Sequence, residues 1–209
     1  MDSLKYILNK FRIQQYGKQM PIVIPNYGRN QLAGLFCELG FIRGVEIGVK
    51  TGQYSEILCK ANPDLRLHSI DPWRCYADCQ IPQERLDGFK AAAQKRLAKY
   101  QYCEIIEKFS MDAVKYFSDA SLDFVYIDGN HLFEYAVNDI AEWSKKVQSG
   151  GIVAGHDWAH YCRDTTHVIE AVLGYTAAYR IRPWFILGNQ AKEPGVIRDD
   201  IRSFMWVKP

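Results

Sequence analysis

The sequence predicts an α/β protein with a doubly wound, Rossmann-like sheet, and two features support this. Short apolar stretches alternate along the chain with segments whose apolar residues recur every three or four positions. This alternation is typical of parallel strands covered by helices on both faces. The last two apolar stretches follow each other without a helix between them, so the final strand is expected to run antiparallel. We therefore predict a seven-stranded, mostly parallel sheet with an antiparallel last strand.

Each element has its own signal in the sequence. Strands are predicted at 44–48, 67–71, 104–106, 122–128, 152–155, 184–187 and 204–207. Helices are predicted at 30–39, from 53, at 83–100, through 114–117, at 132–147 and from about 166. Glycines such as Gly40 and the pair at 150–151 stand where helix ends are expected, and Ile169, Val172 and Leu173 should face the core. Residues 1–29 are assigned to a helical cap segment, and residues 30–209 form the sheet domain.

Composition narrows the class of protein without naming a chemistry. The 209 residues carry 26 Lys+Arg and 24 Asp+Glu, a net charge of +2, which argues against a dedicated duplex-DNA binder. No apolar run approaches the roughly 20 residues of a membrane-spanning helix, and the first residues make a poor signal peptide. The six cysteines are expected to be reduced thiols of a cytoplasmic protein. Cys75 and Cys79, considered as a zinc half-site, lack a second pair at the required spacing.

Ligands of doubly wound sheets bind at the carboxyl ends of the strands, so the residues there are the candidates. The first strand runs into a turn that begins at Gly48 and ends at Gly52. Glycines at such a turn allow close approach of the backbone to a ligand. Asp71 ends the next strand, where a carboxylate can accept hydrogen bonds from ribose hydroxyls. The Gly-x-x-x-Gly spacing differs from the Gly-x-Gly-x-x-Gly of dinucleotide binders, which disfavours a nicotinamide-dependent oxidoreductase.

These motifs together resemble class I S-adenosylmethionine-dependent methyltransferases. The segment 45–55 (VEIGVKTGQYS) resembles their first motif, Asp71 their second acidic position, and 126–131 (YIDGNH) and 150–157 (GGIVAGHD) their later motifs. The likeness is greatest to small-molecule O-methyltransferases related to catechol and macrolide-sugar methyltransferases. It implies O-methylation of a small hydroxylated substrate such as a sugar or polyol, with S-adenosyl-L-methionine as cofactor.

Carried over position by position, the resemblance implies a cofactor site. Glu46 would lie near the methionine amino group, Tyr54 or Ser55 near its carboxylate, and Asp71 at the ribose. Ser110 and Met111 fall where the family contacts adenine, although Lys108 and Phe109 replace an acidic residue that many relatives carry there. The full set of implied cofactor-binding residues is Glu46, Gly48, Lys50, Thr51, Gly52, Tyr54, Ser55, Asp71, Trp73, Ser110, Met111 and Asp128.

A second group of residues concerns the chemistry. By resemblance, Asp128 and His131 are the catalytic pair, His131 taking the substrate proton, and Asp128, His156 and Asp157 are the ligands of a divalent metal such as Mg²⁺ or Mn²⁺. Carboxylate oxygens suit Mg²⁺, whereas the imidazole of His156 suits Mn²⁺, Zn²⁺ or Fe²⁺ better. Binding to a metal would lower the pKa of a substrate hydroxyl. Asp128 could instead cap the next helix and His156 bond within its loop. His160 and His167, in the segment that follows, are further candidates for these roles.

Other interpretations remain open from the sequence. The chain could be a non-catalytic module that binds S-adenosylmethionine or a nucleoside, and the single basic helix face argues against a nucleic-acid substrate. The basic N-terminal segment, with Lys5, Lys10, Arg12 and Lys18, could cover the acceptor site or form a homodimer. The loop at 188–200 is long enough to be functional. Five aromatic residues could wall a cleft or belong to the core: Trp73, Tyr76, Trp158, Tyr161 and Trp184.

Overall fold

The computed structural model describes residues 2–17, 19–75, 81–160, 166–189 and 201–209. It has an α/β fold with one sheet of eight strands in the order β1-β7-β8-β6-β5-β2-β3-β4. The Rossmann-like fold class is thus confirmed, with one strand more than predicted. Several residues named above lie outside the described ranges: Lys18, Tyr76, Cys79, Tyr161 and most of the 188–200 loop. Cys162, the last of the six cysteines, lies outside them as well.

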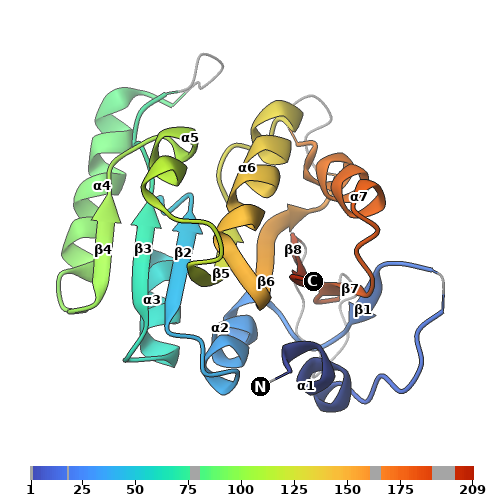
Figure 1. Cartoon of the computed structure of the whole chain (residues 1–209). Coiled ribbons are helices and arrows are strands. Elements are labelled where there is room, and N and C mark those ends of the chain that lie inside the picture. Colours follow the sequence, from blue (N-terminus) through green and yellow to red (C-terminus); the bar gives the residue numbers. More distant parts are fainter. Residues whose placement is uncertain (1, 18, 76–80, 161–165, 190–200) are drawn as a thin grey trace.

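The central strands of the sheet are parallel, and the chain adds strands first on one side of β2 and then on the other. From β2 (Arg43–Ile47) the chain builds outward through β3 (Arg66–Ile70) to β4 (Cys103–Ile106). It then returns to the other side of β2 and continues with β5 (Leu122–Ile127) and β6 (Val147–Trp158) (Figure 1). The order of the strands therefore reverses between β2 and β5. In such sheets the crevice at this switch point is the usual place of a ligand.

The part of the sheet beyond β6 contains the antiparallel strand. β8 (Arg202–Val207) lies between β6 and β7 (Trp184–Leu187) and is antiparallel to both, as the missing helix predicts. The eighth strand, β1 (Ile22–Ile24), pairs in parallel with β7. It lies in the segment expected to be helical, which also contains α1 (Ser3–Lys10). Three residues between two prolines are too short to show a strand period, so the sequence did not reveal β1.

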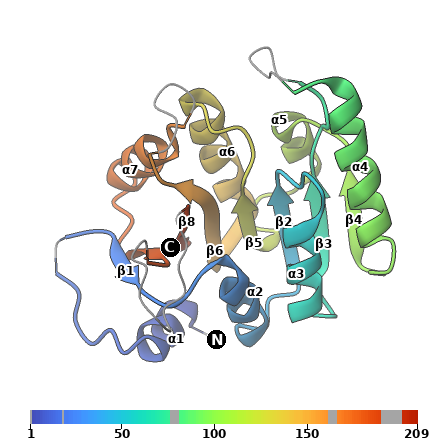
Figure 2. The same cartoon turned by 180° about the vertical axis from the view of Figure 1, so that it is seen from behind.

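Helices cover both faces of the sheet (Figures 1 and 2). One face carries α1 together with α2 (Arg29–Glu38), α3 (Gln53–Ala61) and α4 (Gln83–Leu97). The other carries α5 (Ser110–Ala113), the 3-10 turn Val114–Tyr116, α6 (Phe133–Lys146) and α7 (Val168–Ala178). No helix within the described ranges combines the length and apolar character that crossing a bilayer requires.

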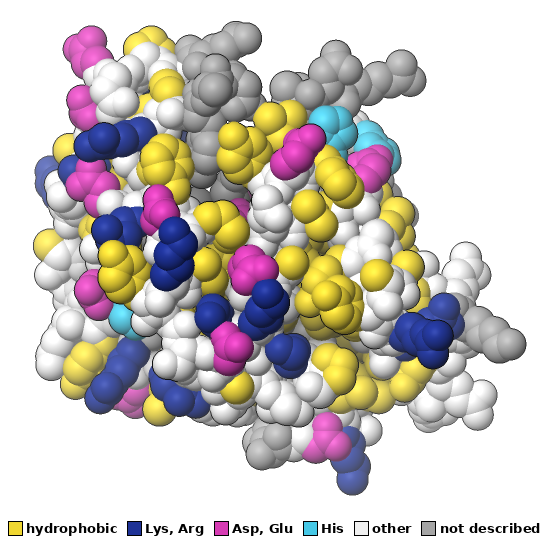
Figure 3. All heavy atoms as spheres, turned by 45° about the horizontal axis from the view of Figure 1, so that its top comes forward, with side chains coloured by type: hydrophobic (Ala, Val, Ile, Leu, Met, Phe, Trp, Pro, Cys, Tyr) yellow, Lys and Arg dark blue, Asp and Glu magenta, His cyan; other side chains and the backbone are white. Residues whose placement is uncertain are grey.

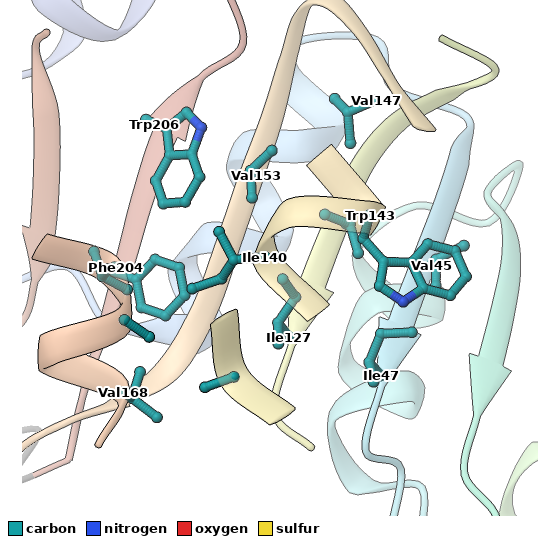
Figure 4. Packing of buried hydrophobic residues seen from close by; sticks show 14 of the residues in the cluster. Val45, Ile47, Ile127, Ile140, Trp143, Val147, Val153, Val168, Phe204 and Trp206 are labelled. Carbon is teal, nitrogen blue, oxygen red and sulfur yellow. The ribbon is translucent and has the colours of Figure 1, made fainter. Parts of the chain in front are cut away.

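Successive side chains of the buried strands point to opposite faces of the sheet, so each strand contributes to a hydrophobic core on both faces. In β5, Val125 and Ile127 face α6 and α7, while Phe124 and Tyr126 face α2 and α3. Figure 4 shows Ile127 in the core between the sheet and the helices α6 and α7, near Trp143, whose indole side chain is fully buried. A strand buried on both faces needs apolar residues at every position. That is why β5 appears in the sequence as a continuous apolar stretch.

Two details of the helices differ from the prediction. Leu173, expected to face the core, is 44% exposed, because α7 turns Ala171 and Val172 inward and leaves their neighbour on the solvent side. The helix expected to reach Val147 ends at Lys146, and β6 begins at once, so the glycines 150–151 lie inside the strand rather than ending the helix. In the described part of the chain, Cys37, Cys59 and Cys103 form no disulfide.

Candidate active site

The turn after β2 can be formed only by glycine at its first position. Gly48 has a φ of +87°, and a Cβ atom there would lie 1.9 Å from the backbone oxygen of Asp128. Gly52 has a φ of +74° and is the N-cap residue of α3. Between them Lys50 also has a positive φ, at 52°. The turn is thus tightly folded against the end of β5, which is the cradle a nucleoside-type ligand needs.

Asp71 fastens this turn to the end of β3. One carboxylate oxygen accepts the N–H groups of Val49 (2.9 Å) and Lys50 (2.8 Å), and the other accepts the N–H of Trp73 (2.8 Å). Burial raises the pKa of Asp71, and these three hydrogen bonds oppose that shift. An ionised carboxylate has about four acceptor sites, so about one remains for a ligand hydroxyl. The position therefore fits the ribose role implied by the resemblance.

Trp73 braces the turn from inside the protein. Its indole N–H donates to the carbonyl oxygen of Lys50 (2.8 Å), and the side chain is only 2% exposed. It packs with Leu86, Ala93 and Leu97 against α4. Among the other turn residues, the Thr51 carbonyl oxygen accepts a hydrogen bond from Arg96 (3.0 Å). Trp73 and Thr51 thus contribute to the position of the loop through the elements behind it.

Glu46 is fully buried on β2 and belongs to a chain of hydroxyl groups. The Ser55 hydroxyl donates to its carboxylate, and the Ser69 hydroxyl donates to Ser55 (3.0 Å). Burial raises the pKa of Glu46 well above its ordinary range, although the hydrogen bond from Ser55 opposes the shift. Tyr54 is also buried and donates its hydroxyl hydrogen to the carbonyl oxygen of Arg29 (2.9 Å). The hydroxyl groups of Tyr54 and Ser55 are therefore both used within the protein.

On the predicted adenine side, the Ser110 side chain points into the protein. Its hydroxyl donates to Asp139 of α6 and accepts the indole N–H of Trp143 (2.7 Å). Met111 packs at the border of the core under α6 and α7. Asp139 is 4% exposed, and burial raises its pKa to about 7. This buried acid has no signal in the sequence, since it lies on a helix that otherwise follows an ordinary amphipathic pattern.

The buried Asp139 should make the stability of the protein depend on pH. Its pKa is about 7 in the folded chain and 3.8 ordinarily, so the folded state holds a proton that the unfolded state has lost between these values. The free energy of unfolding should therefore fall as pH rises from about 4 to 7, by up to about 4 kcal/mol from this group. Asp139→Asn cannot ionise, so its stability relative to wild type should increase across the same range.

Urea unfolding at pH 5 and pH 7.5 measures this difference for both proteins. Asp112→Asn, at a side chain that is 61% exposed, is the matched control and should change the difference little. If the gap between Asp139→Asn and wild type is the same at both pH values, the pKa of Asp139 is not raised as described.

Three side chains meet at the ends of β5 and β6. The ligand atoms of Asp128, His131 and Asp157 all lie within 4.8 Å of one another. His131 Nε2 is 2.9 Å from Asp157 Oδ2 and 3.9 Å from Asp128 Oδ1. Asp157 is almost fully buried, whereas the His131 side chain is 30% exposed. The imidazole is thus the accessible member of a group whose carboxylates lie deeper.

An irregularity in β6 brings His156 and Asp157 to the same place. Neighbouring residues of a regular strand point to opposite faces. Here the pairing of β6 with β8 shifts register between Gly155 and Trp158, and Asp157 has a φ of +63°. As a result His156 Nδ1 lies 3.9 Å from Asp128 Oδ1 and 3.5 Å from Asp157 Oδ2. The three predicted metal ligands are therefore brought together, with His131 as a fourth candidate.

The acids Asp128 and Asp157 change the pKa of the His131 imidazole beside them. Burial alone would lower the pKa of His131, but its hydrogen bonds to Asp128 and Asp157 outweigh this and raise it to about 10. Burial likewise raises the pKa of Asp128, while His131 opposes it. Arg29 adds a second cation, with Nη1 3.4 Å from Asp128 Oδ2. No motif surrounds Arg29, so its only sequence signal is its place at the start of the helix before β2.

Other residues considered from the sequence lie outside this group. His160 is exposed near Glu170, and the His167 N–H donates to the carbonyl oxygen of His131 (2.8 Å), so His167 supports the loop. Trp158 and Trp184 are buried and in edge contact, with ring centroids 5.3 Å apart. These two aromatic residues therefore belong to the core rather than to an open cleft wall.

The carboxyl edge of the sheet has two different halves (Figure 3). Hydrophobic side chains are frequent over the half formed by α6 and α7, whereas charged side chains are frequent over the α4 and α5 half. Phe133 and Tyr135, in the first turn of α6, are exposed apolar residues. Phe133 is two residues from His131, so the group of Asp128, His131 and Asp157 borders an apolar surface.

Comparison with known families shows the family to which the chain belongs. A family model described as "Methyltransferase domain" matches residues 45–158, more than half of the chain, from β2 to the end of β6. The chain belongs to this methyltransferase family. The matched range contains the Gly48 turn, Asp71 and the Asp128–His131–Asp157 group. The methyltransferase is S-adenosylmethionine-dependent, and S-adenosylmethionine is its expected cofactor. No curated protein sequence matches the chain.

Solved structures support the fold of the methyltransferase. A putative caffeoyl-CoA O-methyltransferase from Staphylococcus aureus is 14% identical and superposes with a TM-score of 0.59, covering 97% of this chain and 98% of that chain. An rRNA methylase from Streptococcus thermophilus is 12% identical with a TM-score of 0.58, covering 85% and 95%. Cofactor-bound Rv0187 from MTB is 14% identical with a TM-score of 0.54, covering 99% and 89%. At these identities the likeness shows the fold alone.

Proposed function

We propose that this methyltransferase methylates a hydroxyl oxygen of a small molecule. The observation that carries the proposal is the group of Asp128, His131 and Asp157 at the carboxyl edge, with two carboxylates behind an accessible imidazole. Methyl transfer to oxygen requires that the hydroxyl lose its proton. His131 can accept that proton in its neutral form, which a cation held by Asp128 and Asp157 would favour. The putative caffeoyl-CoA O-methyltransferase of the same fold is consistent with this proposal.

The residues of the site divide into two tasks. The Gly48–Gly52 turn and Asp71 hold the nucleoside part of the cofactor, which supplies an electrophilic methyl group when bound. His131 removes the proton from the acceptor hydroxyl, and Asp157 orients its imidazole through the 2.9 Å contact. The apolar surface around Phe133 excludes water from the apolar part of the acceptor. Positioning of the two reactants contributes most of the rate, as in other bimolecular transfers.

A divalent cation fits the donor set of this site. Two carboxylates and an imidazole within 4.8 Å of one another are suitable ligands for Mn²⁺, and the carboxylates also for Mg²⁺. We propose Asp128, Asp157 and His156 as the ligands, which leaves the His131 imidazole as the base. Such an ion would lower the pKa of a coordinated hydroxyl. It would also occupy the carboxylates that hold the proton on His131.

Methyl transfer to a panel of acceptors tests the proposal. Wild-type protein is incubated with S-adenosylmethionine labelled in its methyl group and with catechols, sugars, polyols, amines or an rRNA fragment. We expect an O-methylated small molecule, identified by mass spectrometry. Label in the RNA or on an amine nitrogen, with none on any hydroxyl compound, would contradict O-methylation of a small molecule.

Removal of divalent metal should lower this activity. In excess EDTA we expect at least a tenfold lower rate, restored by Mn²⁺ or Mg²⁺, because a lost Lewis acid costs several kcal/mol of transition-state stabilisation. Asp128→Asn and Asp157→Asn should weaken Mn²⁺ binding measured by calorimetry without the cofactor. Glu142→Gln, at an exposed carboxylate on α6, is the control. Full wild-type activity in excess EDTA would mean that no metal takes part.

A further inference from the structure

Arg29 is a cation beside the cofactor turn that no methyltransferase motif includes. It is the first residue of α2, and Tyr54 in the first turn of α3 donates its hydroxyl hydrogen to the Arg29 carbonyl oxygen (2.9 Å). The guanidinium carbon lies 5.5 Å from the centroid of the Tyr54 ring, and Nη1 lies 3.4 Å from Asp128 Oδ2. Arg29 therefore bridges the start of α3 and the end of β5. Its side chain is 35% exposed, so a ligand can reach it.

The residues that the resemblance assigns to the methionine carboxylate have no hydroxyl hydrogen to offer it. The single hydroxyl hydrogen of Ser55 goes to Glu46, and that of Tyr54 goes to the Arg29 carbonyl oxygen. Both side chains are buried. A carboxylate placed near them would need another donor, because a charged group without a partner is costly to remove from water.

Arg29 has the chemistry that this carboxylate needs. A guanidinium carries five N–H donors in a planar fork that matches a carboxylate, and its contact with Asp128 involves only one of its nitrogen atoms. The first backbone N–H groups of α3, a helix of nine residues, lie at the same end and favour an anion. Asp128, 3.4 Å from Arg29 Nη1, is an acid that suits the ammonium group of the same amino-acid moiety. The charges thus match a zwitterion.

We propose that Arg29 binds the α-carboxylate of S-adenosylmethionine and is the residue by which this enzyme selects the amino-acid end of its cofactor. The inference rests on the methyltransferase function given above. Arg29 is a binding and positioning residue, since the carboxylate is remote from the transferred methyl group. Its loss should therefore weaken cofactor affinity in proportion to the charge-assisted hydrogen bonds removed.

Calorimetric titration with two ligands tests the assignment. S-adenosylmethionine and its decarboxylated analogue share the adenosine, sulfonium and ammonium groups and differ in the carboxylate alone. For Arg29→Met we expect about 10- to 150-fold weaker binding of S-adenosylmethionine, the equivalent of a charged hydrogen-bond contribution. The decarboxylated analogue should bind wild type and Arg29→Met equally, within about twofold. Arg29→Lys should lose less affinity than Arg29→Met, because it keeps the charge but not the fork.

The second ligand and a control variant distinguish a failure of the Arg29 assignment from a failure of the methyltransferase function. Binding of the decarboxylated analogue reports that each variant is folded, and Arg66→Met, at an exposed arginine at the start of β3, should behave as wild type. Equal losses for both ligands, or no loss for S-adenosylmethionine, would overturn the role of Arg29. An unchanged cofactor affinity with a raised KM for the acceptor would assign Arg29 to the acceptor instead and overturn it too. If wild type binds neither ligand, the methyltransferase function itself fails.

Discussion

Replacing His131 with glutamine is expected to lower the turnover of methyl transfer by about 10²- to 10⁴-fold, the usual contribution of a positioned acid or base. Glutamine has a polar side chain of similar reach but cannot take up the proton of the acceptor hydroxyl. The affinity for S-adenosylmethionine should stay within about twofold of wild type, because His131 pairs with Asp157 and Asp128 at the ends of β5 and β6, whereas the Gly48 turn follows β2. Turnover is measured by S-adenosylhomocysteine formation, and cofactor affinity by calorimetry.

The control for this variant is His160→Gln. His160 follows β6, the strand that carries Asp157, but its side chain is 64% exposed and lies near Glu170 rather than in the carboxylate group, so its loss should leave turnover unchanged. Thermal unfolding of His131→Gln is recorded as well, since the variant removes the cation between two acids. A folded His131→Gln protein that retains more than a tenth of wild-type turnover would show that the imidazole is not the base.

Gly48→Ala should impair both stability and cofactor binding. The left-handed φ of +87° costs a non-glycine residue roughly 1–3 kcal/mol. The new Cβ would lie 1.9 Å from the Asp128 backbone oxygen, and relieving such overpacking costs roughly 1–3 kcal/mol more. Because the turn or the end of β5 must move, we expect S-adenosylmethionine affinity to fall at least about tenfold, or 1.4 kcal/mol.

A second glycine offers a matched control for this prediction. Gly34 lies in the middle of α2, and a Cβ there would meet nothing within 4 Å. Gly34→Ala should therefore be as stable as wild type or more stable by about 0.5–1 kcal/mol, because alanine favours the helix. Urea unfolding gives both stabilities. Equal stability and equal cofactor affinity in Gly48→Ala and Gly34→Ala would contradict the geometry of the turn.

The sequence is sufficient for the central sheet because its strands are buried on both faces. β2, β3 and β5 are short apolar stretches that end at Gly48, Asp71 and Asp128, and each has a helix after it. The antiparallel β8 follows from the missing helix after β7. In contrast, β1 has three residues between two prolines, and only its pairing with β7 makes it a strand. Such pairing depends on tertiary contacts that no local pattern reports.

The candidate site divides in the same way. The residue types and spacing of the Gly48 turn, Asp71 and Asp128 predict their place at the carboxyl edge, because strand ends carry them there. The orientation of Asp157 depends on the register shift in β6, and the positions of Arg29 and Asp139 depend on how α2 and α6 pack. Arg29 and Asp139 have no periodic or motif signal, whereas Asp157 is predicted from the motif at 150–157 and only its orientation is not. The side-chain hydrogen bonds of Tyr54 and Ser55 likewise become visible only when the elements are assembled.

Calorimetric titration of the wild-type protein with S-adenosylmethionine tests the central claim most directly. We expect saturable binding of one molecule per chain, competition by S-adenosylhomocysteine, and no binding of NAD, because the Gly48 turn lacks the dinucleotide spacing. A ligand that binds the native state alone should also raise the unfolding temperature. Absence of binding of either adenosyl ligand at millimolar concentration, or tighter binding of NAD, would contradict the assignment of this site to methyl transfer.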